Sequence, residues 1–296
     1  MNLVIGATGM VGSEICHLLT ADKQPVRGLV RATSDPAKVD TLKSSGVEII
    51  QGDLRDYASL QAACEGVTTV ISTASSMPFS YTPGENDISS VDRDGLKNLI
   101  RAAKAAGTKL FIYTSFSSQI DLDFPLRNAK RSVEEYLKES GLNYTILRPS
   151  YFAEVWLSPA VGFDATNGKA QIFGSGKNPI SWISYLDVAK FAVLSLTTKE
   201  AQNSVLELGG PESLSPLQVV QVFEEVSGKT FEVQHVPEEA LEVQQKAASD
   251  PMQQSFTGLM RCYAQGDFID MQETLKVYPI KLATIRDYAR QTLVTA

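Results

Sequence analysis

Residues 3–12 read LVIGATGMVG, an apolar run of strand character that passes directly into three glycines spaced three residues apart. Gly6 permits a tight turn out of a strand, Gly9 lets the backbone approach a diphosphate, and Gly12 allows the next helix to pack closely on a sheet. A diphosphate bound there would face the positive N-terminus of that helix. The pattern indicates a dinucleotide-binding turn, and its plain alternative is a glycine-rich loop without a ligand. The residues expected to line the turn are Gly6, Thr8, Gly9, Met10, Val11 and Gly12.

Beyond this turn, apolar runs of strand length alternate with segments of helical period as far as Pro149. Strands that are apolar on both faces and alternate with helices predict a parallel sheet covered by helices on both faces. Right-handed crossovers then make the sheet doubly wound. The expected strands are 3–5, 26–30, 47–50, 69–71, 110–113 and 144–147, and the expected helices are 13–19, 37–44, 57–63, 89–106 and 127–140.

After Pro149 the pattern changes, because residues 150–178 are rich in aromatic side chains and glycine and contain no long periodic element. Further along we expect helices at 188–196, 215–227, 238–248 and 285–293, and strands at 205–208 and 231–236. The predicted fold class is therefore α/β, a doubly wound parallel (Rossmann) sheet with a smaller α+β substrate lobe. We expect residues 1–150 to form the dinucleotide-binding domain, 183–210 to return to it, and 151–182 and 211–296 to form the lobe.

Composition excludes several classes of function. The 296 residues include 27 Lys and Arg against 34 Asp and Glu, and this net charge of −7 argues against a nucleic-acid partner. No apolar run approaches the roughly 18 residues of a membrane span. Three dispersed cysteines and two histidines provide neither a disulfide framework nor a metal site. No export signal is visible at the N-terminus, so we expect a cytoplasmic protein whose partner is a small-molecule substrate.

The ends of the second and third strands bear on the choice of cofactor. An acidic residue at the end of the second strand would bond the ribose 2′-hydroxyl of NAD, but Arg31 stands there. A guanidinium can fork onto a 2′-phosphate, which predicts NADP, although a solvated surface arginine is the alternative. Asp53 follows the third strand and is expected beside the adenine amine, as the N-cap of the next helix, or in both roles, which are compatible. The other predicted cofactor contacts are Leu54, Thr73, Ala74, Ser75, Pro149, Tyr151 and Phe152.

Lys130 interrupts an apolar stripe. Leu126, Lys130, Val133 and Leu137 share one face of the predicted helix, at spacings of four, three and four. The lysine either packs its stem while its ammonium reaches solvent, or directs a partly buried ammonium of lowered pKa toward a ligand. Periodicity alone leaves both open. Ser115, after the fifth strand, could bond a substrate carbonyl, although loop serines are ordinary there.

Two irregular segments leave the carboxyl edge of the predicted sheet, where ligands bind in open parallel sheets. They are residues 77–87 and 151–173. Their aromatic side chains predict a substrate pocket bounded by Tyr81, Tyr151, Phe152 and Trp156 with Lys130 on its floor, and ordinary core packing is the alternative.

Together these features resemble the NmrA-like group of atypical short-chain dehydrogenases/reductases. The resemblance is carried by the glycine turn, by Val30-Arg31, by Gly52-Asp53-Leu54 and by Lys130 with the EEYL that follows at 134–137. The segments SGLNYTILRP at 140–149 and ISYLDVA at 183–189 complete it, and it covers roughly residues 1–210. It implies a family of NADPH-dependent quinone, isoflavone and phenylcoumaran-type reductases, together with NADP-binding regulators that do no chemistry.

One departure from the superfamily concerns the proton donor. The usual catalytic tyrosine lies four residues before the lysine, and here that position is Leu126. The usual serine or threonine after the fifth strand falls near Phe116, which leaves Ser115 or Ser117 as substitutes. In the family's reductases without that tyrosine, the matching lysine anchors the nicotinamide ribose or acts as acid and base. The resemblance thus implies a catalytic role for Lys130.

We therefore expect an atypical NADP-dependent oxidoreductase that transfers hydride to a small conjugated substrate such as a quinone or enone. Reduction of a quinone yields a delocalised phenolate that can take its proton later, so loss of the tyrosine is tolerable. The alternative is a non-catalytic NADP(H)-binding redox sensor or assembly factor of the NmrA type. A sugar-nucleotide epimerase or dehydratase is disfavoured, because such chemistry depends on the tyrosine that Leu126 replaces.

Overall fold

The computed structural model describes residues 1–78 and 80–295, and the chain divides into two compact units. The first unit comprises Met1–Ser115, Asn128–Leu147 and Val188–Leu206. The second unit comprises Phe116–Arg127, Arg148–Asp187 and Glu207–Ala296. Residues 116–127, expected in the first domain, thus belong to the second unit, and the segment that returns to the first unit is Val188–Leu206.

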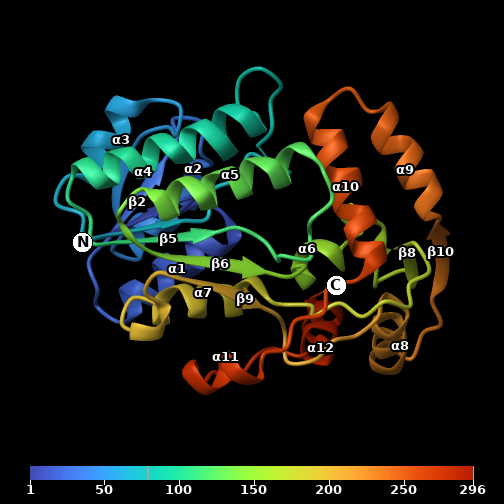
Figure 1. The fold of residues 1–296 in the computed structure, drawn as a ribbon. Helices are drawn as coiled ribbons and strands as arrows, with labels where there is room; N and C mark the ends of the chain where they lie inside the picture. Colours follow the sequence, from blue (N-terminus) through green and yellow to red (C-terminus); the bar gives the residue numbers. More distant parts are fainter. Residues whose placement is uncertain (79, 296) are drawn as a thin grey trace. The chain divides into compact units, whose positions relative to one another are not determined.

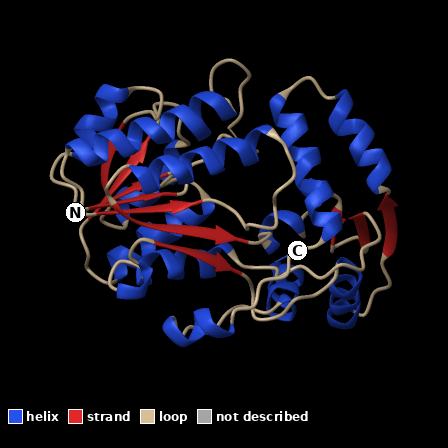
Figure 2. Ribbon diagram, viewed as in Figure 1, coloured by secondary structure: helices blue, strands red, loops and turns tan. Residues whose placement is uncertain are grey.

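The first unit is built on a seven-stranded sheet with the order β3-β2-β1-β4-β5-β6-β9 (Figures 1 and 2). Each ladder from β3 to β6 is parallel, and the strand order reverses direction between β1 and β4. The predicted doubly wound α/β sheet is confirmed. The strands are β1 (Asn2–Ile5), β2 (Val26–Val30), β3 (Glu48–Gln51), β4 (Thr69–Ser72), β5 (Leu110–Thr114), β6 (Asn143–Pro149) and β9 (Ser204–Leu208).

Helices cover both faces of this sheet. In Figure 1, α3, α4 and α5 lie on one face, and α1 and α7 on the other. The predicted helix 89–106 is two elements, because it starts as the π-helix η1 and continues as α4. The helical elements are α1 (Met10–Ala21), α2 (Pro36–Ser44), α3 (Tyr57–Cys64), η1 (Ile88–Gly95), α4 (Leu96–Ala105), α5 (Pro125–Glu139), α7 (Tyr185–Leu194) and the 3₁₀ turn η3 (Lys199–Ala201).

An apolar core fills the space between the sheet and α3, α4 and α5. Leu3, Phe111, Leu99 and Val133 come from two strands and two helices and are all fully buried within it. Burial of each such side chain stabilises the fold by about 1.5–3 kcal/mol relative to exposure.

The second unit contains a small mixed sheet, as the predicted α+β lobe requires. β8 pairs in parallel with β10 and antiparallel with β7. Residues 150–178, expected to contain no long periodic element, hold only short ones, which include these two strands. The helices α10 and α11 were also not predicted. Its elements are α6 (Ala153–Trp156), η2 (Pro159–Val161), β7 (Phe163–Asp164), β8 (Lys169–Phe173), α8 (Pro216–Ser227), β10 (Glu232–Val236), α9 (Glu238–Ala247), α10 (Pro251–Gln265), α11 (Gln272–Val277) and α12 (Ile285–Thr295).

The helix α10 is hard to predict from the sequence because a glycine lies within it. Gly258 lies in its middle and lowers its helix propensity by about 1 kcal/mol relative to alanine. A Cβ at Gly258 would lie 2.4 Å from the ring of Phe124, so the glycine is needed for that contact.

In the part of the chain that the structure describes, no helix is both long enough and apolar enough to span a membrane.

Candidate functional site

The glycine turn between β1 and α1 is sterically closed to larger residues. Gly6 has a φ of +82°, and a Cβ there would lie 2.8 Å from the Thr73 hydroxyl oxygen. A Cβ at Gly12 would lie 2.1 Å from the carbonyl oxygen of Gly6. The amide of Gly9 donates to that carbonyl oxygen at 2.9 Å, and Gly9 itself is exposed. The turn therefore presents bare backbone to solvent at the start of α1.

The N-terminus of α1 differs from those of its neighbours. Asp35 accepts a hydrogen bond from the amide of Ala37 and so caps α2, and Asp56 caps α3 in the same way through Ala58. Across residues 1–78 and 80–295, no side chain caps α1, and its first turn carries no acidic residue. Unsatisfied N–H groups and the helix dipole leave this end of α1 suited to an anion such as a diphosphate.

The sheet register places the predicted site residues of the first unit along one edge. Ile5 pairs with Leu29 and Ser72, and Ser72 pairs with Tyr113, so neighbouring strands end side by side. Gly6, Arg31, Asp53, Thr73 and Ser115 follow these ends. The hydroxyl of Thr73 donates to the carbonyl oxygen of Ile5 at 3.1 Å, which supports the glycine turn from behind.

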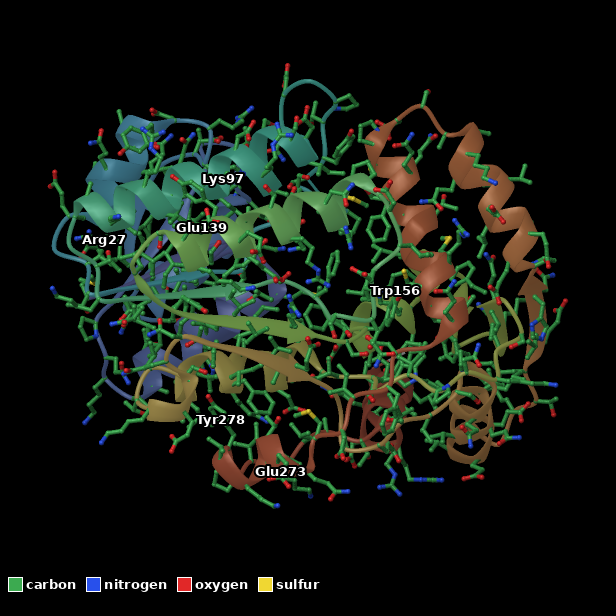
Figure 3. The ribbon with its side chains drawn as sticks, in the orientation of Figure 1. Arg27, Lys97, Glu139, Trp156, Glu273 and Tyr278 are labelled. Atoms are coloured by element: carbon green, nitrogen blue, oxygen red, sulfur yellow. The ribbon has the colours of Figure 1, made fainter. Side chains whose placement is uncertain are left out.

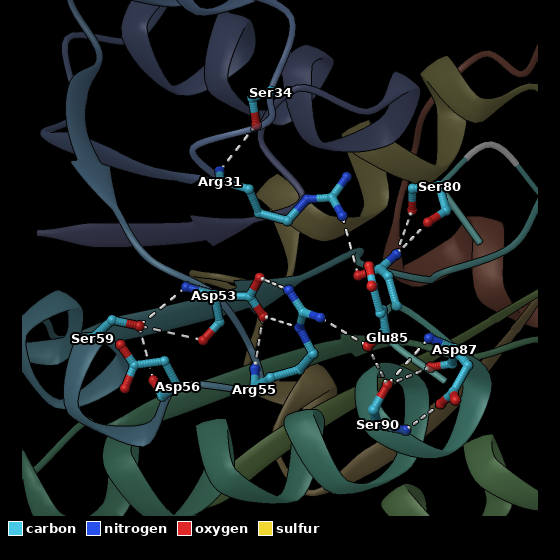
Figure 4. A network of polar contacts seen from close by, with 11 residues as sticks. Arg31, Ser34, Asp53, Arg55, Asp56, Ser59, Ser80, Glu85, Asp87 and Ser90 are labelled. Atoms are coloured by element: carbon cyan, nitrogen blue, oxygen red, sulfur yellow. Dashed lines mark hydrogen bonds and ion pairs between the residues drawn. The ribbon is translucent and has the colours of Figure 1, made fainter. Parts of the chain in front are cut away.

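Arg31 is held by two contacts at the end of β2. Its amide donates to the Ser34 hydroxyl oxygen at 3.0 Å, and its Nη1 donates to the Asn86 Oδ1 at 3.1 Å. Figure 4 shows the guanidinium extended from β2, with Asp53 and Arg55 of the β3 loop on one side of it. The sequence did not point to Asn86, because it lies 55 residues away along the chain in an irregular segment.

Asp53 is engaged by an arginine that sequence reasoning also missed. Arg55 Nε donates to Asp53 Oδ1 at 2.9 Å and Nη2 donates to Oδ2 at 2.7 Å, a two-pronged contact (Figure 4). The hydrogen bond from Arg55 holds the pKa of the Asp53 carboxyl below its usual value of 3.8. The expectation that Asp53 caps the next helix is wrong, because Asp56 does so. Leu54, a predicted cofactor contact, is buried in the apolar core.

Lys130, on α5, directs its ammonium to the end of β5. The residue is only 6% exposed, and its Nζ donates to the Thr114 carbonyl oxygen at 3.3 Å. The ammonium also lies over the ring of Tyr113, 5.5 Å from the centroid. Burial lowers the pKa of this lysine, while the charges of Asp92 and Glu134 oppose that shift. The ammonium thus stays inside the unit, contrary to the reading in which it reaches solvent.

Asp92, on the π-helix η1, is a second buried charge near Lys130 that the sequence did not reveal. It is 0% exposed, and its Oδ2 accepts hydrogen bonds from the amide and hydroxyl of Ser76 at 3.0 and 2.5 Å. Among the described residues its Oδ1 has no hydrogen-bond partner, and neither has the Tyr113 hydroxyl. π-Helical turns are frequent at functional sites. The half-buried Arg131 also acts on Lys130 through its charge. We call Asp92, Tyr113, Lys130 and Glu134, together with Arg131, the buried cluster.

Ser115 lies at the rim of the buried cluster. Its hydroxyl accepts a long hydrogen bond of 3.4 Å from Arg131 Nη1, and the same nitrogen donates to Glu134 Oε1 at 2.7 Å. Ser115 is itself buried, and its amide donates to the Leu147 carbonyl oxygen. Its hydroxyl is therefore oriented by an ion pair on α5.

Tyr151 is enclosed within the second unit. It is 2% exposed, its hydroxyl donates to the Leu259 carbonyl oxygen, and its ring lies 4.9 Å from that of Trp156. Trp156 in turn stacks on Phe256 of α10 and is labelled in Figure 3. Tyr151 was expected to line an open pocket, but its ring is packed in an aromatic cluster. Phe152 is partly exposed.

Other predicted residues have plainer surroundings. The Pro149 carbonyl oxygen accepts a hydrogen bond from the amide of Ser117, and Thr8, Ala74, Ser75 and Tyr81 are partly exposed. Met10 is exposed and Val11 is buried. The segment 77–87, expected to wall a cleft, includes Phe79, which lies outside the described residues.

The second unit also holds a buried acid that sequence reasoning missed. The Ser117 hydroxyl donates to Asp267 Oδ1 at 2.6 Å, and burial raises the pKa of Asp267 to about 6. No signal marks Asp267 in the sequence, since it follows α10 in a short loop and its partner is 150 residues away.

The chain is similar to several known proteins. It is 34% identical over 242 residues to the photosystem II assembly factor Ycf39 of Cyanophora paradoxa, covering 81% of this chain and 73% of that protein. It is 32% identical to an NAD(P)H azoreductase of Xenophilus azovorans, covering 77% and 74%. The quinone oxidoreductase QOR2 of Escherichia coli, solved with NADPH, shares the fold with a TM-score of 0.79 and 24% identity, over 99% of this chain and 100% of that one.

Solved structures of this fold thus include NADPH complexes, and the related sequences include both an NAD(P)H-dependent enzyme and an assembly factor. The model of the NmrA-like family matches residues 2–289, nearly the whole chain. The chain belongs to the NmrA-like family.

Proposed function

We propose that this chain is an NADPH-dependent reductase that transfers hydride to a small conjugated acceptor such as a quinone or an enone. The observation that carries the proposal is the buried ammonium of Lys130 at the end of β5, in the same unit as the glycine turn and Arg31. Identity of 32% to an azoreductase supports the reductase class. We place the reaction in the cytoplasm, where the three free cysteines stay reduced.

The residues of the first unit fit a bound dinucleotide phosphate. The uncapped N-terminus of α1 and the bare backbone at Gly9 would hold the diphosphate. Arg31 would contact the 2′-phosphate, and Arg55 keeps the Asp53 carboxylate from repelling it. Lys130 would bond the nicotinamide ribose or the substrate oxygen. NADPH supplies a hydride when bound.

The protein's task is then to accept the negative charge that develops on the substrate. A quinone takes up one hydride and one proton, and the charge left by the hydride is spread over the ring as a phenolate. The Lys130 ammonium, with its pKa lowered by burial, can give up the proton and regain it from water. Leu126 cannot donate a proton, so a simple ketone would be a poor acceptor.

Steady-state loss of NADPH absorbance across a panel of quinones, enones and simple ketones tests this proposal. We expect turnover with quinones, little with ketones, and loss of turnover in Lys130→Met. The matched control is Lys138→Met on the same helix, because Lys138 pairs with Glu135 at the surface. Tight NADPH binding without oxidation by any quinone or enone would contradict the proposal.

A second candidate is a non-catalytic NADP(H)-binding assembly factor or sensor. It is favoured by the 34% identity to Ycf39 and by the enclosed ring of Tyr151, which leaves one expected wall of a substrate pocket packed. This function keeps the glycine turn and Arg31 but needs no acceptor. It would be supported if the unmodified protein binds NADPH but reduces no acceptor of the panel, and if Lys130→Met still binds NADPH.

A further inference from the structure

We propose that Asn86 is a positioning residue for cofactor specificity, which holds the Arg31 guanidinium in the geometry that reads a 2′-phosphate. The inference rests on the proposed binding of NADPH, and it names a residue from outside the β2 end where such selectivity is usually sought. It concerns only contacts within the first unit.

The contact between the two side chains leaves the guanidinium usable. Arg31 Nη1 donates to Asn86 Oδ1 at 3.1 Å, which engages one of the five N–H donors of the guanidinium. A planar fork that retains its other donors can still form the paired hydrogen bonds that a phosphate accepts. Asn86 therefore restrains Arg31 without occupying it.

Asn86 is itself firmly oriented. It is 7% exposed, and its Nδ2 donates to both the carbonyl oxygen and the hydroxyl oxygen of Ser80. Its backbone forms a reciprocal pair of hydrogen bonds with Thr82, each at 2.9 Å. Because both amide hydrogens face Ser80, the side-chain oxygen faces Arg31. A flipped amide would lose these bonds.

The neighbouring charges favour the same arrangement. Asp53 lies close enough to Arg31 for that guanidinium to lower its pKa, so a bare carboxylate there would compete with a phosphate. Arg55 forks onto Asp53 and also donates from Nη1 to the Glu85 carbonyl oxygen at 2.8 Å (Figure 4). Residues 85 and 86 thus contact both arginines.

A preorganised arginine binds its anion more tightly, because less side-chain freedom is lost on binding. Asn86→Ala removes the restraint without changing any charge. We expect it to weaken NADPH binding about 5-fold and to leave NADH binding unchanged.

The test is a fluorescence titration of NADPH and NADH against the unmodified protein, Asn86→Ala, Arg31→Ala and the double variant. If Asn86 acts through Arg31, the double variant binds NADPH no more weakly than Arg31→Ala alone. The matched control is Asn98→Ala, which breaks an exposed Asn98 to Arg101 contact on α4 and should change neither affinity.

Asn86→Asp provides a second variant that keeps an acceptor oxygen beside Arg31 and adds a negative charge. We expect it to weaken NADPH binding more than Asn86→Ala does, again with NADH unaffected. An unchanged ratio of NADPH to NADH affinity in both variants, equal loss of both cofactors, or additive effects in the double variant would overturn the inference.

The readout separates this inference from the proposed function, because it measures binding and not turnover. Unmodified protein that prefers NADPH, with no effect of the Asn86 variants, would overturn the inference alone. Unmodified protein that binds NADPH and NADH equally would overturn the NADP assignment and this inference together.

Discussion

The two ends of the candidate site in the first unit handle charge in opposite ways. At the ends of β2 and β3, Arg31, Asp53 and Arg55 form an at least partly exposed network that is hydrogen-bonded to the buried Asn86. At the ends of β4 and β5, the buried cluster holds Lys130 and Asp92 away from solvent, with one oxygen of Asp92 lacking a partner among the residues described.

Under the proposed function, the exposed network recognises the cofactor and the buried cluster takes part in the reaction. Exposed charges interact in a medium of high dielectric, so their loss changes ligand affinity far more than folding. Buried charges depend on one another, so the loss of one leaves its partner uncompensated. A functional residue of the buried cluster should therefore also be a structural one, whereas the exposed network should tolerate substitution. The following experiments test this contrast.

Lys130→Met should have the largest effect. It should reduce turnover by about 100-fold or more, and it should lower the free energy of unfolding by about 3–5 kcal/mol because Asp92 and Glu134 lose a buried countercharge. Adding Asp92→Asn should restore part of the stability and none of the turnover. Denaturant titration and NADPH oxidation measure the two quantities, and full stability in the single variant would break the comparison.

Arg31→Asp should reverse the cofactor preference and leave folding intact. The ratio of NADPH to NADH affinity should fall by about 100-fold, since a carboxylate repels the 2′-phosphate and bonds a ribose hydroxyl. Fluorescence titration gives the affinities, and the melting temperature serves as the control. Equal affinity of the unmodified protein for both cofactors would contradict the assignment of Arg31.

The pH dependence of stability should differ between the two ends. The folded-state pKa of Lys130 is lowered below 10.5, so the cost of its buried charge is present at neutral pH and is relieved as the pH rises toward 10.5. The pKa of Asp53 is lowered below 3.8, so its stabilising contribution is present above that pH and is lost as the pH falls through its folded-state pKa.

Unfolding free energies of the unmodified protein, Lys130→Met and Asp53→Asn, measured across pH, isolate these contributions as differences. The difference between the unmodified protein and Lys130→Met should change only at alkaline pH. The difference between the unmodified protein and Asp53→Asn should change only at acid pH. A Lys130 difference that stays constant up to pH 10.5 would show a lysine that is solvated in solution.

Arg55→Lys should have the smallest effect. It keeps the positive charge but loses the two-pronged contact with Asp53, so NADPH should bind about 2- to 3-fold more weakly. Stability should change by less than about 1 kcal/mol, because the pair is partly exposed. A loss of stability comparable with that of Lys130→Met would remove the distinction between the two ends.

Much of the first unit could be predicted because its signals are local. Sheet strands that are apolar on both faces, and the glycine turn that follows the first of them, appear in the sequence within a residue or two of their observed positions. Arg31 was found because its place follows from the end of β2. Lys130 stands out because it interrupts the periodicity of α5, but only the structure shows that its ammonium is buried.

Asp92 and Asn86 could not be predicted in this way. Asp92 belongs to the run VDRDG at 91–95, in which Asp94 looks equivalent, yet Asp92 is 0% exposed and the side chain of Asp94 is 57% exposed. Asp92 lies on the same helical face as the buried Ile88 and Leu96, four residues away on either side. Its partner Ser76 and the ammonium that its charge acts on come from other parts of the chain, so no local pattern marks them. The partner of Asn86 is Arg31, which follows β2 and lies 55 residues earlier in the chain, so no local pattern marks the pair.

The sequence by itself determined the doubly wound sheet, the glycine turn and the presence of an arginine at the end of β2, because steric freedom and hydrophobic period act between near neighbours in the chain. Only the tertiary structure decided which charges are buried, which helix ends lack a cap, and that Gly258 of α10 is required by the ring of Phe124. Burial and capping depend on groups that folding brings together from distant parts of the chain, so the interaction energies of these groups cannot be inferred from neighbouring residues in the sequence.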